Sequence, residues 1–113
     1  MIEYEQLPII TKNEAEKKIK VADRDELCRL LLSICRLEDS KWIQNVYLKY
    51  ISDEDKWVAS AAITGLGHLA RISGELEKDK VISALEDILK NKPELEGKIN
   101  DTINDINVFL GDK

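Results

Sequence analysis

The sequence predicts an all-α domain of five or six short helices in which consecutive helices run antiparallel. Apolar residues recur at steps of three and four along most of the chain, which is the spacing of one helix face. Asp, Ser and Thr precede these segments as helix caps, and the connections between the segments are only a few residues long. A chain of 113 residues, 43% of them hydrophobic, is sufficient for one domain with its own core.

The first eleven residues are expected to form an extended arm. Apolar and polar residues alternate in MIEYEQ, and Pro8 followed by two β-branched residues favours extended backbone. Thr11 and Glu14 then have the spacing of a capping box. A short, strongly charged helix is therefore expected to run from this point to about Val21.

Two more apolar helices complete the N-terminal half. The first is expected to be capped between Asp23 and Glu26, and the second at Asp39 and Ser40. Their inner faces are read from the helical spacing of apolar residues. These faces comprise Leu27, Leu30, Leu31, Ile34 and Cys35 in the first helix and Ile43, Val46, Tyr47, Tyr50 and Ile51 in the second.

The segment from Asp53 to Ala70 carries the clearest packing signal. Asp53 or Asp55 can cap the following helix, where a carboxylate also meets the positive end of the helix dipole. Small residues on its inner face would let a neighbouring helix approach closely, and Gly74 is expected to end the helix in a left-handed conformation. The inner face and its small residues are Val58, Ala61, Ala62, Gly65, Leu66, Leu69 and Ala70.

Two amphipathic helices follow. The first is expected to end at or before Lys92, because Pro93 disfavours continuation, and the second to open near Glu94. Their inner residues are Val81, Ile82, Leu85, Ile88 and Leu89, then Leu95, Ile99, Ile103, Ile106 and Leu110. The combination of a cap and an apolar stripe at Asp23 recurs near Glu54, which favours a helix-pair repeat over a plain bundle.

The central segment resembles a HEAT-type helical repeat. In that family a short acidic turn precedes a helix that begins with Val-Arg and continues through alanines to Leu-Gly. The matching residues are Asp53, Asp55, Val58, Ala61, Ala62, Leu66, Gly67, Val81, Leu85 and Leu89, whereas Ala59 replaces the usual Arg. The resemblance implies a short α-solenoid of helix pairs whose second helices line a concave surface. The residues it would turn toward a partner are Gln44, Asn45, Lys49, Asp79, Ser83, Glu86 and Asp87.

The charge favours a protein partner. With 22 acidic and 17 basic residues, the chain carries a formal charge of −5 and repels nucleic acid and anionic lipid on average. In size and acidity it also resembles the immunity proteins of bacterial contact-dependent growth inhibition. That resemblance implies binding to a toxin, expected to be a basic nuclease, with occlusion of its RNA or DNA site. The alternative is a HEAT-like scaffold or adaptor subunit of a larger assembly.

The residues expected to bind this partner are two tyrosines that fill apolar pockets and six carboxylates that stand in for nucleic-acid phosphates. They are Tyr47, Tyr50, Asp53, Glu54, Asp55, Asp79, Glu86 and Asp87. No catalytic residue, cofactor or metal site is expected, since His68 is the single histidine and no phosphate loop or GxSxG motif is present.

Two further features bear on location and binding. Cys28 and Cys35 lie seven residues apart on one expected helix and cannot bridge there, so they are interpreted as small buried hydrophobes in a reducing compartment. No membrane span or signal peptide is expected, which favours the cytoplasm. Trp42 and Trp57 are interpreted as structural anchors of two helix starts. The alternative, binding hot spots, would require them to be exposed.

Overall fold

The computed structural model describes residues 11–110, and every regular element in that range is a helix. The all-α prediction is therefore confirmed for these residues, whereas the arm expected at the N-terminus lies outside them apart from Thr11. Two single-turn 3-10 helices, η2 (Ile34–Arg36) and η3 (Pro93–Leu95), follow α2 and precede α6. The α-helices are α1 (Lys12–Val21), α2 (Arg24–Ser33), α3 (Ser40–Tyr50), α4 (Lys56–Ser73), α5 (Lys78–Asn91) and α6 (Glu96–Leu110).

Reciprocal capping boxes start the first two helices, which confirms the box predicted at Thr11 and the cap predicted between Asp23 and Glu26. The Thr11 hydroxyl accepts a hydrogen bond from the Glu14 backbone N–H at 3.1 Å, and the Glu14 carboxylate accepts one from the Thr11 N–H at 3.0 Å. Asp23 and Glu26 make the same exchange at the start of α2. Each box satisfies two backbone donors that the helix itself leaves without a partner.

The next two helices also begin at the expected carboxylates. Asp39 accepts from the backbone N–H of Trp42 at 3.0 Å, and Asp55 accepts from that of Trp57 at 2.8 Å. At its other end α4 stops at Gly74, whose φ of 65° is a left-handed conformation that glycine adopts without steric cost. The Gly74 N–H donates to the Ala70 carbonyl there, so the predicted stop is confirmed.

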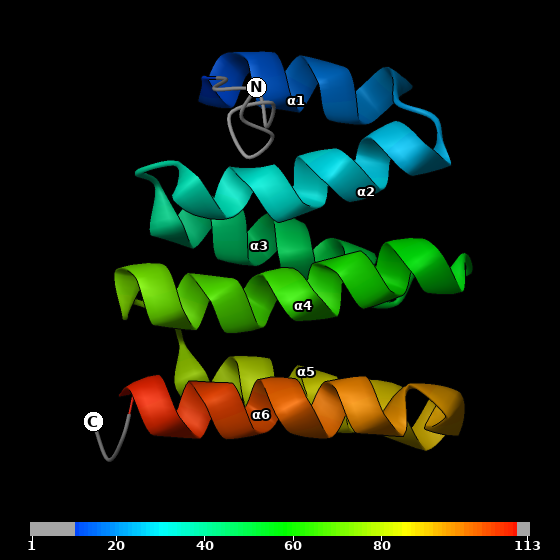
Figure 1. The fold of residues 1–113 in the computed structure, drawn as a ribbon, viewed down its shortest axis with the longest axis vertical. Coiled ribbons are helices and arrows are strands. Elements are labelled where there is room, and N and C mark those ends of the chain that lie inside the picture. The colour runs from blue at the N-terminus through cyan, green and yellow to red at the C-terminus, as the bar shows by residue number, and fades with distance from the viewer. Residues whose placement is uncertain (1–10, 111–113) are drawn as a thin grey trace, which may run out of the picture.

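Consecutive helices run antiparallel and build two layers (Figure 1). Helices α2, α4 and α6 lie side by side and run in the same direction, with α4 in the middle. Behind them, α3 packs against α4 and α5 packs against α6, both in the opposite direction. Helix α1 covers α2 at one end of the stack. The result is a short stack with principal extents of 36 × 30 × 27 Å.

Helix α4 is the centre of the core, because it contacts α2, α3 and α6. A helix packed on three sides has to be apolar over most of its circumference. Every residue that the sequence placed on its inner face is buried, and Ala59, Ile63 and Gly67 are buried in addition. The full set of buried α4 residues is Val58, Ala59, Ala61, Ala62, Ile63, Gly65, Leu66, Gly67, Leu69 and Ala70.

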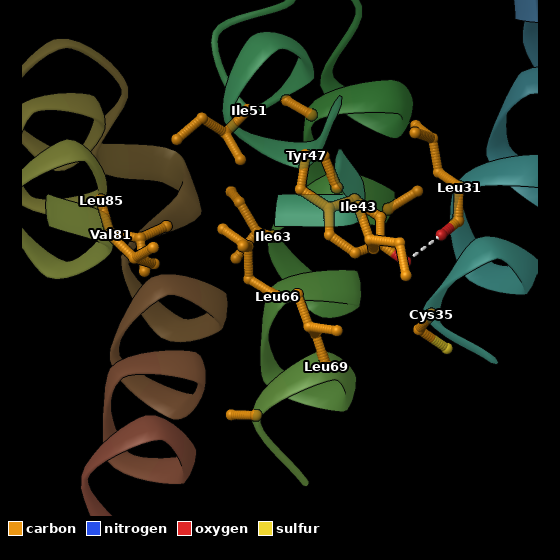
Figure 2. Packing of buried hydrophobic residues seen from close by; sticks show 14 of the residues in the cluster. Leu31, Cys35, Ile43, Tyr47, Ile51, Ile63, Leu66, Leu69, Val81 and Leu85 are labelled. Carbon is orange, nitrogen blue, oxygen red and sulfur yellow. Dashed lines mark hydrogen bonds between the residues drawn. The ribbon is translucent and has the colours of Figure 1, made fainter. Parts of the chain in front are cut away.

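The Tyr47 side chain joins three helices at this core (Figure 2). It extends from α3 over α4, where a Cβ added at Gly65 would overlap the Tyr47 ring. The Tyr47 hydroxyl donates a hydrogen bond to the Leu31 carbonyl of α2, so the polar tip is satisfied in a dry environment. Burial raises the pKa of this phenol far above its usual range, which keeps it protonated.

This burial corrects the interpretation of Tyr47 as a residue that fills a partner's pocket. Its side chain is 0% exposed, so no surface of the ring is open to another protein. The cause is the missing side chain of Gly65 on the neighbouring helix α4, which leaves room for an aromatic ring.

Helix α6 packs against α4 beside a second buried glycine, Gly67. A Cβ at Gly67 would lie 3.4 Å from Asp105 Oδ2, an ordinary van der Waals distance. Three polar contacts cross the seam between the two helices. Thr102 Oγ1 donates to the Ile63 carbonyl at 3.2 Å, Lys98 donates to Thr64 Oγ1 at 3.0 Å, and Arg71 lies 3.6 Å from Asp105. Small residues and satisfied polar groups thus let α6 lie close against α4.

Gln44 is a further correction, since the HEAT resemblance turned it toward a partner and the structure leaves it only 1% exposed. Its amide nitrogen donates to Glu77 Oε1 at 2.7 Å, while its amide oxygen accepts from the Glu77 backbone N–H at 2.7 Å. This two-way exchange fixes the start of α5 against α3. A buried amide is tolerated here because both of its ends are paired.

Replacing Gly65 with Ala should destabilise the protein by about 2–3 kcal/mol, because the new methyl group must displace the buried Tyr47 ring. Gly67→Ala on the same buried helix is the matched control. It meets only ordinary contacts and gains helix propensity, so its stability should stay within about 1 kcal/mol of wild type. Urea unfolding followed by circular dichroism measures both. Equal effects of the two substitutions would contradict the close Tyr47 contact.

Acid should weaken the connection between α3 and α5. The hydrogen bond from Gln44, assisted by Lys80, lowers the pKa of Glu77 below its ordinary value of 4.5. A carboxylate with a lowered folded-state pKa stabilises the fold above its unfolded pKa, and this contribution is lost as the pH falls through the folded pKa. The urea midpoint of wild type should therefore fall more between about pH 6 and pH 3 than that of Glu77→Gln. Parallel pH profiles would show that this carboxylate plays no such role.

Candidate protein-binding surface

The residues predicted to bind a partner lie in three separate places, apart from the buried Tyr47. Tyr50 is half-buried on α3, where the Lys49 ammonium lies 5.5 Å from its ring centroid. The carboxylates of 53–55 lie in the loop before α4, and Asp79, Glu86 and Asp87 are exposed on α5. The structure therefore does not gather the predicted set on one face.

The loop before α4 uses two of its three carboxylates for its own structure. Asp53 Oδ1 accepts from the Asp55 backbone N–H at 2.8 Å, and Asp55 caps α4. Lys92, at the start of η3, donates to the Asp53 carbonyl and ties this loop to the start of the last helix. Glu54 is exposed on the same loop, so its charge faces solvent.

Three helix starts bring carboxylates to one end of the molecule. Helices α2, α4 and α6 run in parallel, so their N-termini all lie at the right-hand end of the stack in Figure 1. Acidic residues favour N-terminal turns because they cap backbone donors and meet the positive end of the helix dipole. We call these residues the acidic end: Asp23, Asp25, Glu26, Asp53, Glu54, Asp55, Glu94 and Glu96. The cations within two residues of them in the chain are Arg24, Lys56, Lys92 and Lys98.

The α2 and α4 parts of the acidic end are in direct contact. Arg24 lies 3.5 Å from Asp25 and 4.0 Å from Asp55, so one guanidinium is shared between carboxylates of two helix starts. Cys28, half-buried on the next turn of α2, is influenced by the same carboxylates. Burial raises the pKa of its thiol, and repulsion from Asp55 and Asp25 raises it further. The carboxylates of the acidic end thus add to the larger effect of burial on this thiol.

Trp57 is a large apolar residue in the first turn of α4 at this end, and it is 59% exposed. It lies on the polar stripe of α4, which continues at helical spacing through Ser60, Thr64, His68 and Arg71. Helices α2, α3 and α6 cover the other sides of α4, and this stripe faces outward. The Lys56 ammonium lies 5.5 Å from the Trp57 ring centroid.

The two tryptophans, which the sequence analysis interpreted in the same way, differ in exposure. Trp42 is half-buried against the core with the Lys12 ammonium 5.5 Å from its ring, which fits a structural anchor. Trp57 does not fit that interpretation, because more than half of it faces solvent. Helical spacing in the sequence could have predicted this exposure. Trp57 lies on the same side of α4 as its polar residues and not on the apolar side.

The exposed part of the predicted concave face is a different surface. Asn45 and Lys49 on α3 are exposed, as are Ser83 and the α5 carboxylates, while Gln44 is not. Asp79 lies in the first turn of α5 and therefore at the far end of that helix from the acidic end. A small groove of about 250 Å³ lies between α1 and α3, with Ile19, Trp42, Val46 and Tyr50 among its lining residues.

Among residues 11–110, no group of three or more His, Cys, Asp or Glu side chains has a geometry that could hold a metal ion. None of the helices in this range is long and apolar enough to cross a membrane.

The reactivity of Cys28 tests the electrostatics of the acidic end. We expect iodoacetamide to alkylate Cys28 more slowly than free cysteine at neutral pH, because the raised pKa reduces the thiolate fraction. Asp25→Asn combined with Asp55→Asn should speed the reaction several-fold, and Asn at position 55 still caps the helix. Cys35 is buried and should react later.

Asp79→Asn removes one charge from the distant part of α5 and is the control, for which the rate of Cys28 alkylation should not change. A double variant of Asp25 and Asp55 that reacts at the wild-type rate would mean that these carboxylates do not set the potential at the thiol.

Comparison of the chain with protein-family models, curated proteins and solved structures found no match.

Proposed function

We propose that the protein works by binding a basic protein partner at its acidic end, without catalysing a reaction. The observation that carries this proposal is the exposure of Trp57 beside the carboxylates of two helix starts. An exposed tryptophan surrounded by charge is typical of the centre of a binding site, where the ring supplies apolar contact area and the charges supply orientation.

The physical roles at this surface are distinct. Trp57 would insert into a pocket of the partner and exclude water, which is the usual property of an interface hot spot. Glu54, exposed on the loop, would meet Lys or Arg of the partner and accelerate encounter, most strongly at low salt. Asp53 and Asp55 are held by their own hydrogen bonds, so they would offer fixed charges with little further loss of entropy on binding.

The more specific form of this proposal is an immunity protein that neutralises a basic nuclease toxin in the cytoplasm. Its carboxylates would occupy the positions of nucleic-acid phosphates and block access of RNA or DNA to the toxin. The net charge of −5 and the carboxylates at one end of the stack support this form. The resemblance to immunity proteins of contact-dependent growth inhibition points in the same direction.

A HEAT-like scaffold or adaptor subunit is the second proposal. The alternation of α2, α4 and α6 in one layer with α3 and α5 in the other supports it, because stacked helix pairs present one layer to a partner. In this form the exposed α3 and α5 residues, with Asn45, Ser83 and Glu86 among them, would make the contact. The two proposals use different faces and can therefore be separated by substitution.

Affinity capture tests the proposal. The tagged full chain is used to isolate binding proteins from its own cells, and the captured protein is titrated with variants. Trp57→Ala should weaken binding about 30-fold, which corresponds to a hot spot of about 2 kcal/mol. Glu54→Lys with Glu94→Lys should weaken binding and reduce its salt dependence. If the captured protein is a nuclease, an equimolar amount of the chain should stop it from degrading RNA or DNA.

Glu86→Lys with Asp87→Lys makes the same charge change on α5 and is the matched control, which should bind like wild type. Loss of binding in this control, with normal binding by Trp57→Ala, would move the contact to the α3 and α5 face and favour the adaptor. A captured nuclease that stays fully active when bound would contradict occlusion.

A further inference from the structure

The groove between α1 and α3 is lined by apolar side chains that the core does not fully cover. Ile19 of α1 is half-buried against the core, as are Trp42, Val46 and Tyr50 of α3. The groove measures about 250 Å³, which is below the roughly 300–1,000 Å³ of most small-molecule pockets. Its size therefore suits one or two side chains of a peptide segment better than a cofactor.

Charged residues border this apolar floor. Lys20 near the end of α1 and Lys49 near the end of α3 are exposed on the rim of the groove, together with Glu16. Two lysines and one glutamate make the rim positive, although the chain as a whole carries a charge of −5. A segment that combines apolar residues with carboxylates is therefore complementary to the groove.

The chain enters α1 at one end of the same groove. Lys12, in the first turn of α1, donates to Asp39 at 2.9 Å, and its ammonium lies 5.5 Å from the Trp42 ring centroid. From Trp42 to Tyr50 the groove extends along α3 for about 12 Å at the helical rise per residue. About four extended residues cover this distance at roughly 3.3 Å each. Residues 1–10 are therefore long enough to return from the start of α1 and lie along the groove.

The composition of residues 1–10 matches the groove. Glu3 and Glu5 are the charged residues of this segment, so it is acidic. Ile2 and Tyr4 alternate with them. Successive side chains of an extended segment point to opposite sides, so Ile2 and Tyr4 share one side and the two carboxylates share the other.

We propose that residues 1–10 bind in the groove between α1 and α3 of their own chain. Ile2 and Tyr4 cover the apolar floor, and Glu3 and Glu5 pair with the two lysines on the rim. The segment thereby joins α1 to α3 and closes this face to other proteins.

The covalent link favours this occupant over a separate protein. A short connection to the start of α1 keeps the segment at an effective concentration of about millimolar, so a weak contact is sufficient. A basic protein would instead meet Lys20 and Lys49 with like charge. Tyr50, which the sequence analysis assigned to partner binding, is then covered by the chain itself. The proposal does not rest on the acidic end, which lies at the starts of α2, α4 and α6, and either could fail without the other.

Quenching of Trp42 fluorescence by acrylamide tests the proposal in the full chain. Trp57→Phe leaves Trp42 as the single tryptophan. In this background, Ile2→Ser with Tyr4→Ser should raise the quenching constant of Trp42 about twofold, because the indole ring loses part of its apolar cover. Circular dichroism checks that the fold is kept.

The matched control is Val21→Ser with Val108→Ser in the same background. Both valines are exposed and neither lines the groove, so the quenching constant of Trp42 should stay at the value of Trp57→Phe alone.

Charge reversal tests the ion pairs. Glu3→Lys with Glu5→Lys should also raise the quenching constant of Trp42. Adding Lys20→Glu and Lys49→Glu to this variant should restore the protection, because the two signs are then exchanged across the same contact.

A quenching constant that does not respond to the substitutions at positions 2 and 4 would overturn the proposal. Protection of Trp42 that grows with protein concentration would also overturn it, because the groove would then hold a segment of another copy. Protection lost on the first pair of charge reversals and not restored by the second would contradict the pairing with the rim lysines.

Discussion

The fold depends on the contact between Tyr47 and Gly65. One side chain from α3 crosses the bare backbone of α4 and ends in a hydrogen bond to the carbonyl of Leu31 on α2. Three helices are thereby held in one register by a ring that has no room to move, since interiors are packed as densely as crystals of small molecules. Helix α6 packs on another side of α4, where Thr102 donates to the Ile63 carbonyl and Lys98 donates to Thr64. Of the two glycines on these sides of α4, only Gly65 is required by a close contact.

The surface follows from this arrangement. Because α3 and α5 return the chain, α2, α4 and α6 begin at the same end, and the carboxylates that cap them gather there. Each carboxylate has a local reason to exist, as a cap or a favourable charge near a helix dipole. Their common location is a result of topology. The same packing covers α4 on three sides. Trp57 lies on the remaining side and therefore faces solvent near these carboxylates.

Features set by nearby residues could be predicted from the sequence, and features set by distant residues could not. The caps at Thr11, Asp23, Asp39 and Asp55 and the stop at Gly74 depend on neighbours within four positions, and all were confirmed. The burial of Tyr47 and Gln44 depends on Gly65 and Glu77, which are far along the chain. The candidate site was only partly predictable for the same reason: the loop of 53–55 was found, but its association with α2 and with Trp57 required the stack.

Native-state hydrogen exchange tests the central role of α4 most directly. The account predicts that backbone amides from Ala61 to Ala70 exchange only through global unfolding, because opening α4 disrupts its contacts with α2, α3 and α6 together. Amides of α1, which packs mainly against α2 at one end of the stack, should open at a lower free energy. If the amides of α4 exchanged as readily as those of α1, the stack would not be built around α4, and the account of the fold given above would be wrong.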